Sequence, residues 1–244
     1  MTIPYSIIIP ARYASTRLPG KPLLKIKGKP LIQQVYEQAR LSDARAIYIA
    51  TDDERVRKSA KKFNANVVMT SDKHESGTDR LAEVIEKEFI AHDEIIVNVQ
   101  GDEYGLPNIL IEQVAELLHA HPDAKVATLC EPIEKEEDYL NPNIVKVVKD
   151  KQNRALYFSR SPIPHNRDDG LLKQCFRHIG LYAYRAGYLS QFTKMPISAL
   201  EKNEKLEQLR VLENGDRIII DVARAKSGIG IDTKEDLALV IKQV

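Results

Sequence analysis

Residues 7–22 read IIIPARYASTRLPGKP and predict a strand followed by a cationic loop, before a helical pattern that begins near Pro30. The apolar run stops at Pro10, and the loop beyond it carries Arg12, Arg17 and Lys21. A loop at the carboxyl end of a strand occupies the place where open α/β sheets bind ligands. Three cations together with a run of backbone N–H groups suit a polyphosphate at this place.

Strands and helices are expected to alternate through the first half of the chain. An apolar run at 6–10, typical of a strand covered on both faces, predicts the first strand, and further strands are expected at 46–50, 66–69 and 95–99. Helical spacing of apolar residues predicts helices at 30–41, 54–63 and 108–119, and one capped by Thr78. This alternation predicts an α/β fold, a three-layer sandwich around a mostly parallel sheet.

The second half has a different character. The expected strands are 126–129, 145–149, 155–158, 178–184 and 217–222, separated by turn-like stretches. Helices are expected at 200–212 and, capped by Thr233, at the carboxyl end of the chain. We expect a mostly antiparallel lobe inserted at about 132–217, and because no flexible linker separates the parts, one domain over 1–244.

Composition favours a cytoplasmic protein with no global preference for polyanions. The formal net charge of +1 favours neither nucleic acid nor an anionic membrane, so we expect neither as a partner. Cys130 and Cys175 lack a CxxC spacing and are expected to be reduced thiols. We expect no signal peptide, and no apolar run approaches the ~20 residues that a membrane helix needs.

Two aspartates follow expected strands and suit a metal site. Asp102 comes just after the strand at 95–99, and Asp232 precedes the last helix. Either residue alone could be a turn or helix-capping residue. Together, opposite a cationic loop, they would form a site for Mg²⁺ and a triphosphate.

Other polar residues lie at the ends of expected elements. Ser76 and Gly77 form a polar loop that could either cap a helix or contact a base or ribose. In the second half the candidates are Arg160, His178, Tyr182, Glu207 and Gln208, each of which could also be structural.

Motifs in the same order along nearly the whole chain resemble the 3-deoxy-manno-octulosonate (Kdo) cytidylyltransferases, the CMP-Kdo synthetases. The matching stretches are residues 9–23, 50–53, 76–80, 97–103, 155–160, 177–182, 206–210 and 230–233. The resemblance implies a Rossmann-like nucleotidyltransferase sheet, a homodimer formed through the second lobe, and a role in lipopolysaccharide biosynthesis. It implies that the anomeric hydroxyl of Kdo attacks the α-phosphate of CTP, with Mg²⁺ as cofactor, to give CMP-Kdo and pyrophosphate.

The resemblance also implies roles for individual residues. Catalysis would depend on Arg12, Lys21, Asp102 and Asp232, and the two aspartates would bind the metal. CTP would contact Pro10, Ala11, Arg12, Arg17, Lys21, Ser76, Gly77 and Asp102. The sugar acid would contact Arg80, Gln100, Arg160, His178, Tyr182, Glu207 and Gln208.

Two alternatives stay open at this point. One is a cytidylyltransferase for another acidic sugar, such as 8-amino-Kdo or sialic acid. The other is a non-catalytic nucleotide-binding homologue. One departure bears on the sugar: the chain reads Tyr104-Gly105 after Glu103, where the family usually has a proline next.

Overall fold

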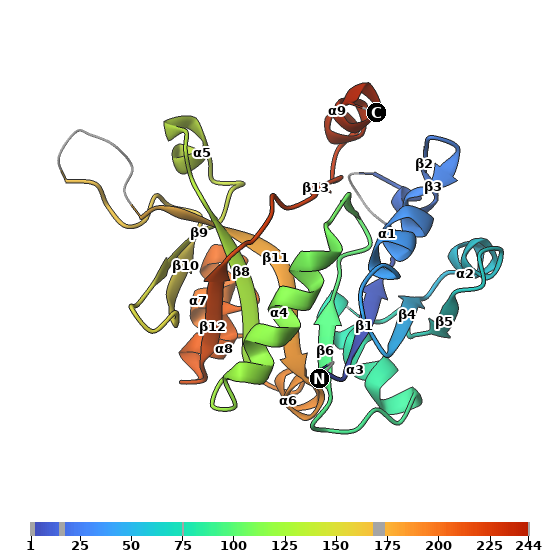
Figure 1. Ribbon diagram of the computed structural model, residues 1–244, viewed down its shortest axis with the longest axis horizontal. Helices are drawn as coiled ribbons and strands as arrows, with labels where there is room; N and C mark the ends of the chain where they lie inside the picture. Colours follow the sequence, from blue (N-terminus) through green and yellow to red (C-terminus); the bar gives the residue numbers. More distant parts are fainter. Residues whose placement is uncertain (1–2, 15–17, 75, 168–173, 244) are drawn as a thin grey trace.

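The computed structural model describes residues 3–14, 18–74, 76–167 and 174–243 (Figure 1). Within these residues a nine-stranded sheet forms the centre of the molecule. Its strands are β1 (Tyr5–Pro10), β4 (Ala46–Thr51), β5 (Asn66–Met69), β6 (Ile95–Asn98), β8 (Val126–Pro132), β9 (Lys146–Lys149), β10 (Ala155–Ser159), β11 (Phe176–Arg185) and β12 (Ile218–Val222). Two short ribbons stand outside it, β2 (Lys25–Ile26) with β3 (Lys29–Pro30) and β7 (Glu103–Tyr104) with β13 (Ile229–Gly230).

Helices cover both faces of the sheet. They are α1 (Leu31–Ala39), α2 (Glu54–Lys61), α3 (Gly77–Lys87), α4 (Asn108–Ala120), α5 (Glu136–Leu140), α6 (Ala186–Phe192), α7 (Ala199–Glu204), α8 (Leu209–Glu213) and α9 (Lys234–Gln243), with the 3-10 turn η1 (Lys21–Leu23). Among the described residues, no helix is both long enough and apolar enough to cross a membrane.

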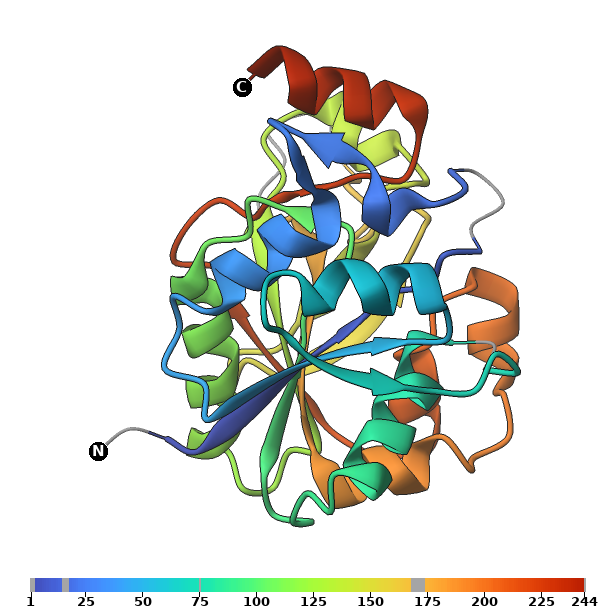
Figure 2. The ribbon, with the colours of Figure 1, turned by 90° about the vertical axis from the view of Figure 1, so that its right-hand side faces the viewer.

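The parallel part of the sheet has the order β6-β1-β4-β5. All residues of β1 are buried, because its side chains alternate between two covered faces. Ile7 and Ile9 lie in the core that includes residues of α1 and α4, whereas Ile8 lies in the core that includes residues of α3 and α6. Figure 2 shows the helices on the two sides of the sheet. The predicted three-layer α/β sandwich is confirmed.

β11 joins the two halves of the chain in one sheet. It lies antiparallel between β6 and β8, and β12 pairs parallel with β8. We expected this strand in the inserted lobe, yet Ile179, Leu181 and Ala183 are buried in the same core as Ile7. β9 and β10 form the antiparallel addition that the second half predicts. The lobe boundary at about 132–217 stays a prediction.

The single helix expected at 200–212 is wrong. The chain forms α7 and α8 instead, and Lys205 between them has left-handed backbone angles (φ +54°). The Glu204 carboxylate at the end of α7 accepts hydrogen bonds from the Ser159 hydroxyl (2.6 Å) and the Arg160 N–H (2.9 Å). Leu206, which directly follows this break, is buried in the core.

Candidate active site

The cationic loop is fixed at its start to the end of β4. The Ala11 N–H donates to the Ala50 carbonyl (2.8 Å), and the Thr51 hydroxyl donates to the Ala11 carbonyl (2.7 Å). Pro10 and Ala11 therefore lie at the carboxyl edge of the parallel strands, as predicted. Arg12, the next residue, is exposed.

Gly20 closes the loop and sets the position of Lys21. Its φ of +69° favours glycine, and a Cβ there would lie 3.1 Å from the Tyr13 ring. The Gly20 N–H donates to the Tyr13 carbonyl (3.0 Å), and Lys21 begins η1 directly afterwards. Arg17, the third predicted cation, lies outside the described residues.

Lys21 stands between the two predicted metal ligands. Its Nζ lies 2.5 Å from Asp102 Oδ2 and 2.9 Å from Asp232 Oδ1. Burial by itself would lower the pKa of Lys21, but Asp102 and Asp232 outweigh burial and raise it above the usual value. The two carboxylates thus converge on one charged cation, although they are 130 residues apart in sequence (232 − 102).

The ribbon of β7 and β13 brings the two aspartates together. Tyr104 pairs with Ile229, and the Ile231 N–H donates to the Asp102 carbonyl (3.1 Å). The strands approach closely because Gly228 lacks a side chain: a Cβ there would lie 2.5 Å from the Tyr104 carbonyl oxygen. Close packing of backbone on backbone therefore sets the spacing of the site.

Neither aspartate is used as a helix cap. At the start of α9 the Asp236 carboxylate accepts from the N–H groups of Asp232 and Thr233, and the Thr233 hydroxyl accepts from the Asp236 N–H. α4 begins at Asn108, six residues beyond Asp102. The capping alternatives for both aspartates are therefore not what the structure shows.

A cavity of about 400 Å³ lies at this place. The predicted site residues that line it are Pro10, Ala11, Arg12, Lys21, Gly77, Gln100, Asp102 and Asp232. A larger cavity, of about 770 Å³, is lined by residues of α3 and α6 and by none of the predicted site residues. The smaller cavity therefore carries the candidate chemistry.

Ser76, not Thr78, is the N-cap of α3. The Ser76 hydroxyl accepts from the Asp79 N–H (3.0 Å), and the Asp79 carboxylate accepts from the Ser76 N–H (3.2 Å). The expected cap at Thr78 is wrong because this reciprocal capping box already satisfies the helix start. The Thr78 hydroxyl instead donates to the Glu207 carboxylate.

β11 positions His178 and Tyr182. An irregularity in the pairing with β8 directs the Ile179 and Leu181 carbonyls to the Thr128 hydroxyl (3.1 and 2.8 Å). That hydroxyl has one proton to donate, so its oxygen accepts from Nε2 of His178 (3.0 Å). Nδ1 of His178 is thereby assigned as an acceptor.

Aromatic rings extend along this strand. Tyr182 lies between His178 (5.2 Å between ring centroids) and Tyr184 (5.7 Å). Burial lowers the pKa of His178 to about 3, so its imidazole is neutral at pH 7. Burial, and then Glu207, raise the pKa of Tyr182 well above its usual value, so its hydroxyl stays protonated.

Glu207 and Gln208 occupy the turn between α7 and α8. Gln208 is buried at the start of α8, and Glu207 is half-buried against Thr78. Burial raises the pKa of Glu207, while the hydrogen bond from Thr78 and the charge of Arg210 oppose that rise. The structure thus brings the turn of the second half against the first turn of α3.

Arg80 is fully buried near the start of α3, and its contact with a sugar stays a prediction. Its side chain has no exposed surface, and its guanidinium donates to Asp52 (2.9 Å) and to the Thr70 hydroxyl. Two helical positions correspond to a rotation of about 200°, so Arg80 points away from the side on which Thr78 meets Glu207. Arg80 ties α3 to the ends of β4 and β5.

Arg160 is half-buried and lies apart from the cavity lining. Its guanidinium donates to the carbonyls of Glu204 (2.8 Å) and Pro142 (3.0 Å). These bonds use only part of its five donors.

Two residues near the site were not predicted. Burial, followed by the charge of Asp102, raises the pKa of Glu103 to about 7. Thr78 was assigned only as a cap, although the pattern Ser76-x-x-Asp79 itself indicates a cap at Ser76 and leaves the Thr78 hydroxyl for another partner.

Comparisons with known proteins identify the family of this chain. A family model described as cytidylyltransferase matches residues 6–218, which makes the chain a nucleotidyltransferase of the cytidylyltransferase class. Curated 3-deoxy-manno-octulosonate cytidylyltransferases from Cellvibrio japonicus and Vibrio parahaemolyticus are 54% and 52% identical, each over 97% of this chain and 96% of the relative. The chain therefore belongs to the 3-deoxy-manno-octulosonate cytidylyltransferase family, and the resemblance drawn from its motifs is confirmed.

Solved structures show the same fold. The structure of a CMP:2-keto-3-deoxy-manno-octonic acid synthetase complexed with CTP has a TM-score of 0.92 and 42% identity, and the match covers 98% of each chain. A 4-diphosphocytidyl-2C-methyl-D-erythritol synthase, 14% identical with a TM-score of 0.63, covers 99% of each chain and shares the fold alone.

Proposed function

We propose that this chain joins CTP and Kdo to give CMP-Kdo and pyrophosphate, which activates Kdo for lipopolysaccharide assembly. The oxygen of the anomeric hydroxyl bonds to the α-phosphorus, the bond from that phosphorus to the bridging oxygen breaks, and the hydroxyl proton passes to solvent. The observation that carries the proposal is Lys21 held between Asp102 and Asp232 beside the loop after β1. The relatives that share this length of chain support the choice of substrates.

We propose that Asp102 and Asp232 hold Mg²⁺ when the nucleotide is bound. The donor set fits, because both carboxylates already converge on one cation, the Lys21 ammonium. Among the described residues no cluster of three or more His, Cys, Asp or Glu suits a metal. Two carboxylates plus substrate phosphates are nevertheless a usual Mg²⁺ environment. When bound, the metal would supply positive charge against the triphosphate and the pyrophosphate that leaves.

The residues of the cavity would divide between the substrates. Arg12 and Lys21 neutralise phosphate charge, and Arg17 stays a prediction of the same kind. Pro10, Ala11 and Gly77 of the cavity lining would surround cytidine, together with Ser76, which precedes Gly77 outside that lining. Catalysis would come from positioning and charge stabilisation.

The sugar would bind along β11 and the turn before α8. Nδ1 of neutral His178 would accept a hydrogen bond from a sugar hydroxyl. Further hydrogen bonds would come from Gln100, Tyr182, Glu207 and Gln208. Arg160 stays a prediction as the cation for the sugar carboxylate, since it keeps donors beyond those used by carbonyls.

We further propose a cytoplasmic homodimer. Neither Cys130 nor Cys175 forms a disulfide in the part of the chain that the structure describes. The edge strand β10 exposes Leu156 and α5 exposes Leu140, both within the segment 132–217 that would form the interface. Light scattering at twice the chain mass would support the dimer, and scattering at the monomer mass would reject it.

Pyrophosphate release over a panel of nucleotides and sugar acids tests the activity. We expect release with CTP and Kdo in the presence of Mg²⁺, and loss of turnover in Asp232→Asn without loss of the fold. Pyrophosphate release with sialic acid or with 8-amino-Kdo, but not with Kdo, would show that the other sugar acid is the substrate. Binding of CTP with no release for any sugar acid would indicate a non-catalytic homologue.

A further inference from the structure

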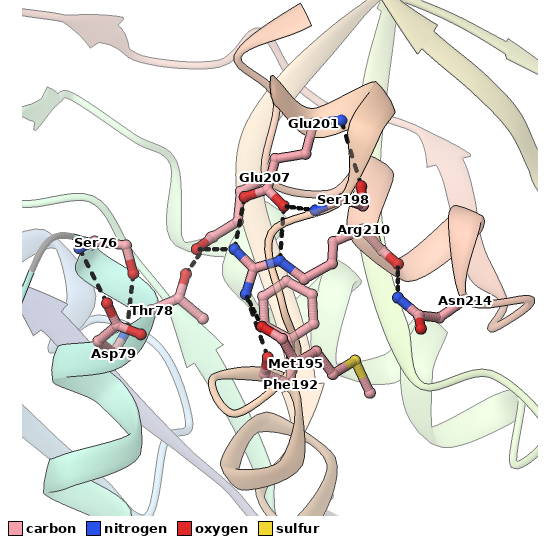
Figure 3. A network of polar contacts seen from close by, with 10 residues as sticks. All are labelled: Ser76, Thr78, Asp79, Phe192, Met195, Ser198, Glu201, Glu207, Arg210 and Asn214. Atoms are coloured by element: carbon pink, nitrogen blue, oxygen red, sulfur yellow. Dashed lines mark hydrogen bonds and ion pairs between the residues drawn. The ribbon is translucent and has the colours of Figure 1, made fainter. Parts of the chain in front are cut away.

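A polar network joins the start of α3 to the turn before α8 (Figure 3). The Thr78 hydroxyl donates to Glu207 Oε2, and the Arg210 guanidinium lies on the other side of the same carboxylate, with Nη2 3.9 Å from Glu207 Oε1. Thr78 is buried and follows Gly77, which lines the nucleotide cavity. One carboxylate is thus contacted by two elements that are far apart in sequence.

Arg210 is itself held in place by several partners. Its Nε and Nη2 donate to the two oxygens of Glu201 (2.7 and 2.6 Å), and Nη1 donates to the carbonyls of Phe192 (3.3 Å) and Met195 (3.4 Å). The guanidinium also lies 4.5 Å from the centroid of the Phe192 ring. Bidentate pairing of this kind fixes direction as well as distance. Arg210 therefore cannot follow Glu207 if that side chain turns away.

Glu201 is anchored through the start of its own helix. Its carboxylate accepts from the Ser198 N–H (3.2 Å), and the Ser198 hydroxyl accepts from the Glu201 N–H (3.4 Å). Glu201 and Arg210 are both buried. The cap of α7 thus positions Glu201, and Glu201 positions Arg210, which lies beside Glu207.

The charges explain why Glu207 has lone pairs left for a ligand. Arg210 satisfies Glu201 by two short bonds but approaches Glu207 only at 3.9 Å. Thr78 supplies one neutral hydrogen bond and no charge. The neighbours of Glu207 therefore orient its carboxylate but leave lone pairs on its oxygens. Those oxygens can accept hydrogen bonds from sugar hydroxyls.

We propose that Thr78 and Arg210 are positioning residues that hold the Glu207 carboxylate in the direction in which it receives the sugar acid. This inference rests on the proposed function, in which Glu207 is a sugar contact. Neither residue touches the reacting atoms. Each acts through Glu207, from opposite sides of its carboxylate.

The first test compares Thr78→Val with Thr78→Ser. Loss of a hydrogen bond to a charged group costs about 10- to 100-fold, so Thr78→Val should lower kcat/KM for the sugar acid by that factor. The KM for CTP should stay within about twofold, and Thr78→Ser should restore most activity because it keeps the hydroxyl. Thr193→Val is the matched control, since among the described residues its hydroxyl bonds to the Ser190 carbonyl on α6 (3.4 Å) and to no site residue. Equal rises in both KM values with a lower Tm would overturn the inference.

A double-mutant cycle tests whether the effect passes through Glu207. Adding Thr78→Val to Glu207→Gln should cause no further loss of kcat/KM for the sugar acid. Arg210→Lys and Arg210→Met should likewise lower kcat/KM only when Glu207 is present, and the effect of Arg210→Lys should be the smaller one. Additive losses would overturn the inference. Should Arg210→Met fail to fold, the Thr78 cycle decides alone.

The two proposals fail in distinguishable ways. All variants are assayed with whichever sugar acid the wild-type chain turns over. No turnover of any sugar acid by the wild-type chain would reject the proposed function and this inference together. Wild-type turnover with an unaffected Glu207→Gln or Thr78→Val would reject this inference alone.

Discussion

Lys21 illustrates how one side chain can serve two sets of partners. Its ammonium balances Asp102 and Asp232, which would otherwise repel each other. The proposed triphosphate brings anionic oxygens to the same place. A lysine suits such an exchange, because its three donors rotate freely about a compact charge.

Lys21→Ala should therefore act on the nucleotide rather than on the sugar. Removing a charge-assisted contact to phosphate should raise the KM for CTP by about tenfold or more, while the KM for Kdo stays within about threefold. Steady-state pyrophosphate release measures both constants, and Lys25→Ala, at an exposed lysine on β2, is the control. An unchanged KM for CTP would remove Lys21 from the phosphate site.

The sequence predicts where some site residues lie, but it does not predict the surroundings of others. Asp102 and Lys21 were identifiable because each lies directly after a strand or glycine turn that sets its position. Arg80 belongs to a matching motif too, but its direction depends on how α3 is rotated against β4 and β5. The spacing of residues along the sequence does not determine how α3 is rotated.

Among the elements, the ribbon of β7 and β13 controls the candidate site. It pairs Glu103 with Gly230 and Tyr104 with Ile229, directly beside the two aspartates. Gly105 follows the ribbon with a φ of +72°, a left-handed backbone conformation that favours glycine, whereas Tyr104 in β7 stands where the family usually has proline.

Gly228→Ala should separate the two strands of this ribbon. A Cβ 2.5 Å from the Tyr104 carbonyl oxygen forces the backbone to move, which should cost about 1–3 kcal/mol of stability. The movement changes the spacing of Asp102 and Asp232, so kcat should fall by about tenfold or more. Gly230→Ala is the matched control in the same strand, because its Cβ would approach nothing closer than 3.9 Å. Equal kcat values for the two variants would show that the ribbon does not set the site.

For the whole molecule, β11 decides how the halves cooperate. It pairs with β6 from the first half and with β8 from the second, and its apolar side chains lie in both cores. Removal of β11 would therefore expose buried surface in both parts of the described sheet. That the chain unfolds as one unit, without a separately stable lobe, stays a prediction.

Urea unfolding should consequently show one transition. Far-UV circular dichroism follows the backbone, and near-UV circular dichroism follows the ten tyrosines, which lie in both halves of a chain without tryptophan. The two midpoints should coincide, as expected for all-or-none unfolding. A first transition that removes only part of the tyrosine signal would instead indicate a separately stable lobe.

The sequence by itself determined the parallel half of the sheet, the cationic loop, the positions of Asp102 and Asp232 at element ends, and the family. These features depend on short stretches in which apolar runs, glycines and charges follow one another at fixed spacing. Only the tertiary structure decided that β11 enters the main sheet, that the helix near Lys205 breaks, that Arg80 is buried, and that Thr78 meets Glu207. The reason is physical: these outcomes depend on side chains distant in sequence that compete for the same buried partners, and no local pattern contains that competition.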